Sequence, residues 1–162
     1  MRLGFRPYTE ADYARVLEMC VAAFEPIHKG FEQALGSQIF ELQYRDWREQ
    51  YADTLRKISP ADANKRVYVA EADGVVAGFI FTFVDAQRKT GEIGLNAVDP
   101  RLQGNGIGRA MYEFALKDLK ARGAEIACVG TGGDDAHGPA RDAYASVGFD
   151  KAIPGMFLFK VL

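Results

Sequence analysis

The sequence has few cysteines, no long hydrophobic run and no excess of positive charge, and each shortage excludes a class of protein. Two cysteines, Cys20 and Cys128, are too few for a disulfide framework or a zinc pattern, so we expect reduced thiols in a cytoplasmic protein. The longest apolar run, residues 75–84, is too short to cross a bilayer, and no apolar segment typical of a secretion signal follows Met1. A net charge of −2 provides no basic surface for nucleic acid.

What the sequence does contain is enough apolar material for one folded domain. Its 162 residues are 48% hydrophobic and 26% charged, and no internal repeat, low-complexity tract or linker divides them. We therefore expect a single domain over residues 1–162. His28 and His137 have no partners at metal-ligand spacing, so no metal site is predicted.

Apolar periodicity predicts a mixed order of strands and helices. Thr9 and Asp12 are typical of the start of a helix, which Pro26 is expected to end, and a longer helix is expected over residues 39–55. Asp73-Gly74 predicts a type I′ turn between two antiparallel strands. Further expected elements are strands at residues 3–6, 92–98, 125–130 and 156–162 and helices at residues 107–119 and 140–147. One strand–helix–strand unit after antiparallel strands indicates an α+β sandwich, not a doubly wound sheet.

A glycine-rich stretch, Gln103-Gly104-Asn105-Gly106-Ile107-Gly108, lies between an expected strand and the helix that starts near Ile107. Glycines at such a junction let backbone N–H groups turn toward one anion, and the helix N-terminus adds partial positive charge. The residues alone leave two interpretations open. The stretch is either a cradle for a pyrophosphate or a turn that lets the strand and the helix pack closely.

Two motifs make the chain resemble the GCN5-related N-acetyltransferases (the GNAT family). The family's cofactor motif, Gln/Arg-x-x-Gly-x-Gly/Ala, is matched by residues 103–108. A second signature is matched at His137, Ala140, Tyr144 and Gly148-Phe149, and the opening Phe5-Arg6-Pro7 also looks like the family's first strand. The resemblance covers most of the chain. It implies the GNAT-type acyl-CoA N-acyltransferase fold, a mostly antiparallel twisted sheet with a parallel, splayed strand pair and flanking helices.

The resemblance also implies that acetyl-CoA is the acyl donor. The backbone of Ala97 and Val98 would pair with the pantetheine arm like an added strand, and N–H groups near the start of the helix would hold the pyrophosphate. His137 stands where many relatives have an asparagine that contacts the cofactor. Arg109 either adds charge near the phosphates or is a solvated surface residue. The expected cofactor contacts are Ala97, Val98, Gln103, Gly104, Asn105, Gly106, Ile107, Gly108, Arg109 and His137.

Acetyl transfer to an amine needs a base for an ammonium group with a pKa of about 10 and an acid for the departing thiolate. Glu92 resembles the base of histone-type relatives in its spacing, although it also fits a solvated residue at a strand end. Tyr144 matches the general acid of many relatives, although it also fits a half-buried packing residue. Strand alternation places Glu92 and Asn96 on one face if no bulge intervenes, where Asn96 would position a water. Cys128 is expected in the core and not as a nucleophile.

Residues 27–59 are least similar to the family. We expect acceptor-site helices over residues 24–59, with Phe24, His28 and Trp47 contacting the substrate. The aromatic residues of this region equally fit a hydrophobic core. Two further segments carry the motifs: residues 92–123 the acetyl-CoA-binding motif, and residues 137–149 the second cofactor and catalytic motif.

The chain is therefore predicted to be an N-acetyltransferase that moves the acetyl group of acetyl-CoA directly to a primary amine of a small molecule or peptide. A non-catalytic acyl-CoA-binding regulatory module is the alternative with the same fold. A dinucleotide-binding domain fits less well, because Arg109 occupies the place of the third glycine of Gly-x-Gly-x-x-Gly. No nucleic-acid or membrane partner is expected. Homodimers are common in the family, and the resemblance leaves that state open for this chain.

Overall fold

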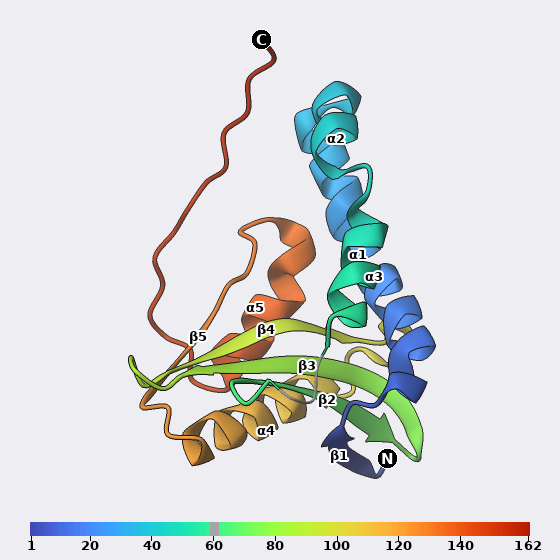
Figure 1. Ribbon diagram of the computed structural model, residues 1–162. Coiled ribbons are helices and arrows are strands. Elements are labelled where there is room, and N and C mark those ends of the chain that lie inside the picture. Colours follow the sequence, from blue (N-terminus) through green and yellow to red (C-terminus); the bar gives the residue numbers. More distant parts are fainter. Residues whose placement is uncertain (59–61) are drawn as a thin grey trace.

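A five-stranded sheet organises the computed structural model of the chain, which describes residues 1–58 and 62–162 (Figure 1). The strands lie in the order of the sequence: β1 (Leu3–Pro7), β2 (Lys65–Ala72), β3 (Val75–Asp85), β4 (Thr90–Val98) and β5 (Ile126–Val129). Neighbours from β1 to β4 are antiparallel, whereas β4 and β5 are parallel. The predicted mixed sheet with one parallel pair is therefore confirmed.

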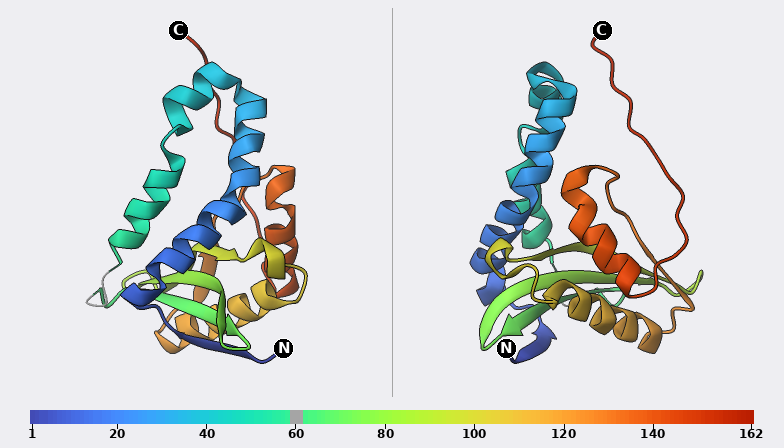
Figure 2. Two further views of the ribbon diagram at one scale, coloured as in Figure 1. Left: turned by 90° about the vertical axis from the view of Figure 1, so that its right-hand side faces the viewer. Right: turned by 180° about the vertical axis from the view of Figure 1, so that it is seen from behind.

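Helices cover both faces of this sheet (Figures 1 and 2). One face carries α4 (Ile107–Ala121) with α5 (Gly138–Ser146) packed beside it. The other carries α1 (Tyr13–Leu35), and α2 (Ser37–Tyr44) and α3 (Trp47–Arg56) pack against α1. Short 3₁₀ helices are η1 (Glu10–Asp12), η2 (Pro100–Leu102) and η3 (Asp135–His137). Within residues 1–58 and 62–162, none of the helices combines the length and the apolar character that a bilayer crossing requires.

Local sequence signals explain the ends of several elements. Asp73 and Gly74 both have positive φ angles, 50° and 86°, as the predicted type I′ turn requires. The backbone N–H of Thr9 donates to Asp12 over 2.8 Å, so the predicted cap before α1 is present. Gly123, with φ of 94°, follows the end of α4 as a left-handed residue.

Three predicted secondary-structure elements differ from the structure. Pro26 does not end the first helix, because α1 continues through it to Leu35. The single helix expected over residues 39–55 is divided into α2 and α3 at Arg45 and Asp46. The strand expected over residues 156–162 is absent from the described chain, where this segment is extended and forms no ladder. Ser59, the last residue of the predicted acceptor segment 24–59, lies outside the described residues.

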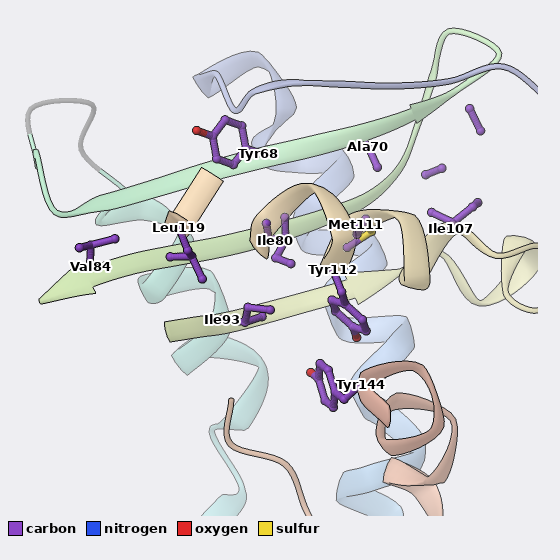
Figure 3. Close-up of a cluster of buried hydrophobic side chains, with 13 residues drawn as sticks. Tyr68, Ala70, Ile80, Val84, Ile93, Ile107, Met111, Tyr112, Leu119 and Tyr144 are labelled. Atoms are coloured by element: carbon purple, nitrogen blue, oxygen red, sulfur yellow. The ribbon is translucent and has the colours of Figure 1, made fainter. Parts of the chain in front are cut away.

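The core consists of two apolar clusters, one on each face of the sheet. Figure 3 shows the cluster between the sheet and α4, which includes Ile80, Ile93, Met111 and Leu119. The second cluster lies under α1 and α3, and Cys20 belongs to it, as predicted. Burial raises the pKa of the Cys20 thiol to about 12.

Cys128 does not belong to either cluster, so its predicted place in the core is wrong. Its side chain is exposed, as is the side chain of Ile126 on the same face, because none of the described helices covers this face of β5. Burial of the thiol and the charge of Glu92 on the paired position of β4 both raise the pKa of Cys128. The thiol is therefore a weak nucleophile even though solvent reaches it.

An irregularity in β4 decides which side chains face the site. Ile80 of β3 lies opposite Asn96 and Thr82 lies opposite Ile93, so β4 has one residue more than β3 between these pairs. The extra residue breaks the alternation. Ile93 and Asn96 both face α4, whereas Glu92, next to Ile93 in the regular part of the strand, faces the α1 side. The expectation that Glu92 and Asn96 share one face is therefore wrong.

Candidate functional site

A cavity of about 780 Å³ opens where β4 and β5 separate. Its walls come from the middle of α1, from β4, from the start of α4 and from α5. This volume is within the range of small-molecule sites. Its lining includes most of the predicted site residues: Phe24, Glu92, Asn96, Ala97, Val98, Gln103, Gly104, Gly106, Ile107, Gly108, Arg109, His137 and Tyr144.

The two parallel strands separate after a short ladder. Their pairing ends where Ile93 lies opposite Val129, but β4 continues to Val98. Among the described residues, the edge of β4 that faces away from β3 therefore has no strand beside it beyond Ile93, and Gly130 and Thr131 line the cavity after β5 has ended. An open strand edge can pair with an extended chain of amides, so this part of the cavity fits a pantetheine arm.

The glycine stretch forms the second part of the cavity. Gly104 and Gly106 have positive φ angles of 79° and 78°, which non-glycine residues rarely adopt. Gly106 is also the N-cap of α4, and it brings no side chain that would occupy the first N–H groups of the helix. These groups remain available to a ligand, and the 15-residue helix adds its dipole. The residues present therefore fit a pyrophosphate.

A buried carboxylate fixes the chain that leads into this turn. Asp99 accepts hydrogen bonds from the backbone N–H of Arg101 over 2.9 Å and from its Nη2 over 2.8 Å, and it also pairs with Arg15 of α1. The hydrogen bond from the Arg101 side chain, together with that from Arg15, outweighs the effect of burial and holds the pKa of Asp99 well below its usual range. The charged form therefore ties α1 to the end of β4.

Asn105 and Arg109 are engaged with the protein itself. The side-chain nitrogen of Asn105 donates to the carbonyl of Leu102 over 3.0 Å, and Asn105 does not line the cavity. Arg109 lines it but donates over 2.9 Å to Glu113, one helical turn further along α4. His137 lines it as well, and its Nδ1 lies 2.6 Å from Asp134.

Three side chains form a hydrogen-bonded group at the wall of the cavity. The Tyr112 hydroxyl donates to Asn96 Oδ1 over 2.9 Å, and Asn96 Nδ2 donates to the Tyr144 hydroxyl over 3.1 Å. Asn96 Nδ2 also lies 2.9 Å from the carbonyl of Gly94, which can only accept, so the amide end of Asn96 is fixed. The Tyr144 oxygen therefore accepts this bond, and its O–H group keeps one hydrogen to donate.

The two tyrosines of this group are packed against each other (Figure 3). Their ring centroids lie 4.5 Å apart, and Tyr144 is only 6% exposed. Asn96 is thus bonded to the hydroxyl groups of two buried tyrosines, and its role in positioning a water stays a prediction. Glu92 lines the same cavity from the other face of β4, and its side chain is exposed.

The predicted acceptor contacts divide into two groups. Phe24 lines the cavity and packs on Tyr51, with ring centroids 4.8 Å apart. His28 and Trp47 do not line it; their rings stack at 4.1 Å between α1 and α3. Burial, with a smaller effect of the charge on Arg48, lowers the pKa of His28 to about 4, so this ring is neutral.

Sequence reasoning missed Tyr112, and among the α1 residues that face the site it named only Phe24. Tyr112 lies beside the apolar stripe of α4, and nothing in the local pattern distinguishes it from a packing residue. Ala22 and Pro26 line the cavity on one face of α1. Pro26 has no N–H, so the carbonyl of Ala22 lacks its usual helical donor. Gly94 was an available signal for the bulge in β4, because glycine within a strand often marks one.

Comparisons with known proteins agree with this geometry. Residues 36–149, more than half of the chain, match the model of the acetyltransferase (GNAT) family. A mycothiol acetyltransferase from Thermomonospora curvata is 30% identical over 136 residues, which are 81% of this chain and 44% of that protein. One from Streptomyces bingchenggensis is 35% identical over 82 residues, 51% of this chain and 26% of that protein. The chain thus spans less than half the length of these curated relatives.

Solved structures with the same fold include proteins with bound ligands. The PaiA N-acetyltransferase from Thermoplasma acidophilum in complex with coenzyme A has a TM-score of 0.71 at 18% identity, covering 93% of this chain and 91% of that one. An aminoglycoside acetyltransferase from an uncultured soil sample, in complex with sisomicin, has a TM-score of 0.60 at 21% identity, covering 99% and 96%. At these identities the similarity concerns the fold. The match of the family model over residues 36–149 shows that this chain belongs to the acetyltransferase (GNAT) family.

Proposed function

We propose that this chain transfers the acetyl group of acetyl-CoA directly to a primary amine of a small molecule or peptide. One observation carries the proposal: the anion cradle at Gly104 and Gly106 opens into the same cavity as Tyr144, Asn96 and Glu92. A site that only bound the donor would not need Tyr144 as an acid on one face of β4 and the carboxylate of Glu92 on the other. Membership of the family supports acetyl-CoA as the donor, which supplies a reactive thioester.

The donor would be held mainly by backbone groups. The N–H groups at the start of α4 bind the pyrophosphate, and the open edge of β4 at Ala97 and Val98 pairs with the pantetheine amides. The remaining expected contacts, Gln103, Ile107, Gly108, Arg109 and His137, line the same part of the cavity. Asn105 would act on the shape of the turn through its bonds to Leu102 and Gln103.

Tyr144 would protonate the departing thiolate. Its hydroxyl oxygen accepts from Asn96, so its hydrogen would be the one given to the thiolate, and donation from Asn96 would stabilise the phenolate left behind. Tyr112 holds Asn96 in the required orientation. Tyr112 therefore acts as a positioning residue, and Tyr144 is the catalytic acid.

Glu92 would remove a proton from the acceptor amine, directly or through water. It lies on the α1 side of β4, opposite the face from which Tyr144 approaches, so the amine and the leaving thiolate would meet separate groups. The acceptor would enter between β4 and the middle of α1. Residues 24–58 of the predicted acceptor segment would then provide one wall through Phe24, with His28 and Trp47 stabilising that wall from behind.

The lining favours an acceptor with one amine on a mostly uncharged body. Among the described residues of the cavity, only Glu92 and Asp142 are carboxylates, and the α1 wall consists of small and apolar residues: Ala22, Ala23, Phe24, Pro26 and Ile27. A polycationic acceptor such as an aminoglycoside needs several anionic partners. The carbonyl of Ala22, which lacks its helical donor, would accept a hydrogen bond from the amine.

Release of free thiol from acetyl-CoA, measured with a panel of amines, tests the proposal. The panel contains compounds with one amino group and no other charge, peptides with a free amino terminus, and an antibiotic with several amino groups. We expect turnover with neutral-bodied monoamines, and its loss by about 100-fold in Tyr144→Phe, with unchanged acetyl-CoA binding by calorimetry. Tight acetyl-CoA binding without turnover on any amine would favour the regulatory module. Absence of binding at millimolar concentration would contradict both functions.

A further inference from the structure

The carboxylate of Glu92 lies among apolar side chains on the α1 side of the sheet. Glu92 is exposed, lines the cavity, and forms no ion pair with any residue in 1–58 or 62–162. Its partners in the strand register are Phe83 on β3 and Cys128 on β5. Ile126, two residues before Cys128, faces the same side. An unpaired anion with apolar neighbours complements a cation that carries an apolar body.

These three apolar side chains, which we call the apolar floor, are open to solvent. Ile126 is 64% exposed, Phe83 is 38% exposed, and Cys128 is exposed as well. The helices α1 and α3 cover a different part of this face, where Phe79 and Phe81 are buried. Figure 1 shows the hairpin between β3 and β4 projecting away from α1 and α3. A ligand can therefore reach the floor without any movement of these two helices.

The floor continues into the cavity past two glycines. The next residues on this face are Gly94 of β4 and Gly130 after β5, and both line the cavity together with Glu92. A Cβ at Gly94 would meet the Cβ of Phe81 at 3.3 Å, so Gly94 lies on the same face as Phe81. Neither glycine brings a side chain between Glu92 and the point where β4 and β5 separate. A group anchored at Glu92 therefore has an open route to the proposed donor site.

Charged groups mark the far limits of the floor. Lys89 pairs with Glu125 over 2.6 Å, directly before Ile126, and Lys65 of β2 lies opposite Phe83. Along β5 the floor spans two residues, Ile126 to Cys128, which is about 7 Å of strand. This length accommodates a ring or a branched alkyl group a few bonds from the amine. It does not accommodate a long apolar chain.

We propose that the acceptor is a primary amine with a short, uncharged apolar body, bound with its ammonium group at Glu92 and its body on Phe83, Ile126 and Cys128. The inference rests on the proposed function and adds to it the chemical class and the orientation of the acceptor. An ammonium N–H bond breaks and its proton passes to a carboxylate oxygen of Glu92, which leaves the neutral amine at the open route past Gly94. Phe83 and Ile126 are then specificity-determining residues.

Alkylation of Cys128 tests the inference without any turnover. Iodoacetamide modifies this exposed thiol slowly, and Cys20 is buried, so the intact mass of the chain reports on Cys128 alone. We expect 2-phenylethylamine at millimolar concentration to slow the modification about threefold, and ethylamine, which lacks the body, to leave the rate unchanged. Ile126→Ser should remove the protection, whereas Val75→Ser, at a similarly exposed residue of β3, should retain it. Equal rates with and without 2-phenylethylamine would overturn the inference.

Turnover of the same two amines separates this inference from the proposed function. In wild type, kcat/KM should be about tenfold higher for 2-phenylethylamine than for ethylamine, because only the former places apolar groups on the floor. Ile126→Ser should lower the value for 2-phenylethylamine about tenfold through KM, with the value for ethylamine and the KM for acetyl-CoA unchanged. Equal kcat/KM values for the two amines in wild type would overturn the inference and leave acetyl transfer in place. Protection of Cys128 without turnover of any amine would support the amine site and contradict the proposed transfer.

Discussion

Arg15 on α1 is paired with the buried carboxylate of Asp99, the residue that leads from β4 into the glycine turn. The pair connects the helix that forms the proposed acceptor wall with the strand that forms the proposed donor wall. The guanidinium of Arg15 also donates to the carbonyl of Val76 over 3.2 Å. The two sides of the cavity are therefore held in one arrangement before any ligand binds, which reduces the cost of ordering them on binding.

Replacing Asp99 by Ala should weaken both stability and donor binding. Arg15 would keep only the exposed Glu18 as a charged partner, so we expect a loss of about 3 kcal/mol in the free energy of unfolding by urea. The turn also loses its hydrogen bonds to Arg101, and the dissociation constant for acetyl-CoA should rise about tenfold. Glu113→Ala, which breaks the exposed pair with Arg109, is the control and should cost less than about 1 kcal/mol.

The hydroxyl of Tyr112 should matter for catalysis although it does not reach the reacting atoms. In Tyr112→Phe, Asn96 Oδ1 loses its donor, and the amide is no longer held against Tyr144. We expect kcat to fall about tenfold while the KM for acetyl-CoA stays the same, as for a positioning residue. Tyr68→Phe removes another buried hydroxyl, bonded to Asp118 over 2.8 Å at the far end of the same cluster, and should leave kcat unchanged. Equal kcat values for wild type and Tyr112→Phe would remove Tyr112 from the mechanism.

Gly106 should tolerate no branched side chain. Its φ of 78° is strongly unfavourable for valine, and Gly106→Val would force the turn out of the conformation that presents the first N–H groups of α4. We expect calorimetry to detect no acetyl-CoA binding while circular dichroism shows a folded domain. Gly108→Ala is the matched control, since its added Cβ meets Val98 only at 3.8 Å, an ordinary contact. Tight binding by Gly106→Val would contradict the cradle.

The parts of the fold and of the glycine turn that the sequence predicted are those fixed by local backbone chemistry. The Asp73-Gly74 turn and the positive φ angles of Gly104 and Gly106 follow from what glycine and aspartate tolerate, independently of distant contacts. The parts that it did not predict depend on partners far along the chain. The face of Asn96 depends on one extra residue in β4, and the importance of Tyr112 depends on a neighbour that the fold brings to it.

The C-terminal segment illustrates the same limit in another form. Residues 156–162 have the composition of a strand, but a strand requires an edge to pair with, and no described part of the same chain provides one at that place. Pro26 shows that a strong local signal can also be overruled, since the contacts of α1 on both sides of it keep the helix continuous.

The stability of the helical region should depend on pH through His28. Its pKa is about 4 in the folded chain, chiefly because it is buried, and 6.5 is usual for an exposed histidine. Between these values the unfolded chain binds a proton that the folded chain does not, so stability falls as the pH is lowered from 6.5 to 4. The loss should reach about 2 to 3 kcal/mol.

Urea unfolding of wild type and His28→Phe at several pH values between 6.5 and 4 measures this effect. The variant should show a flatter dependence, because the titrating ring between Tyr44 of α2 and Tyr51 and Arg48 of α3 is gone. Trp47→Phe keeps His28 in place and should retain the steeper dependence. Identical slopes for wild type and His28→Phe would show that His28 is not the responsible group.

Replacing Pro26 by Ala should stabilise the chain and impair its use of the acceptor. Alanine restores the N–H that the carbonyl of Ala22 lacks, so the helix gains a hydrogen bond. We expect the free energy of unfolding to rise by about 1 to 2 kcal/mol. This gain is smaller than the full helix penalty of proline, because the unfolded chain becomes more flexible. The same bond occupies the carbonyl that we propose for the amine, and α1 would straighten where it lines the cavity. The KM for the amine should therefore rise several-fold while the KM for acetyl-CoA is unchanged. Gln33→Ala, at an exposed residue of α1 that does not line the cavity, is the control and should change neither KM. A more stable Pro26→Ala variant with an unaltered KM for the amine would show that the Ala22 carbonyl does not contact the acceptor.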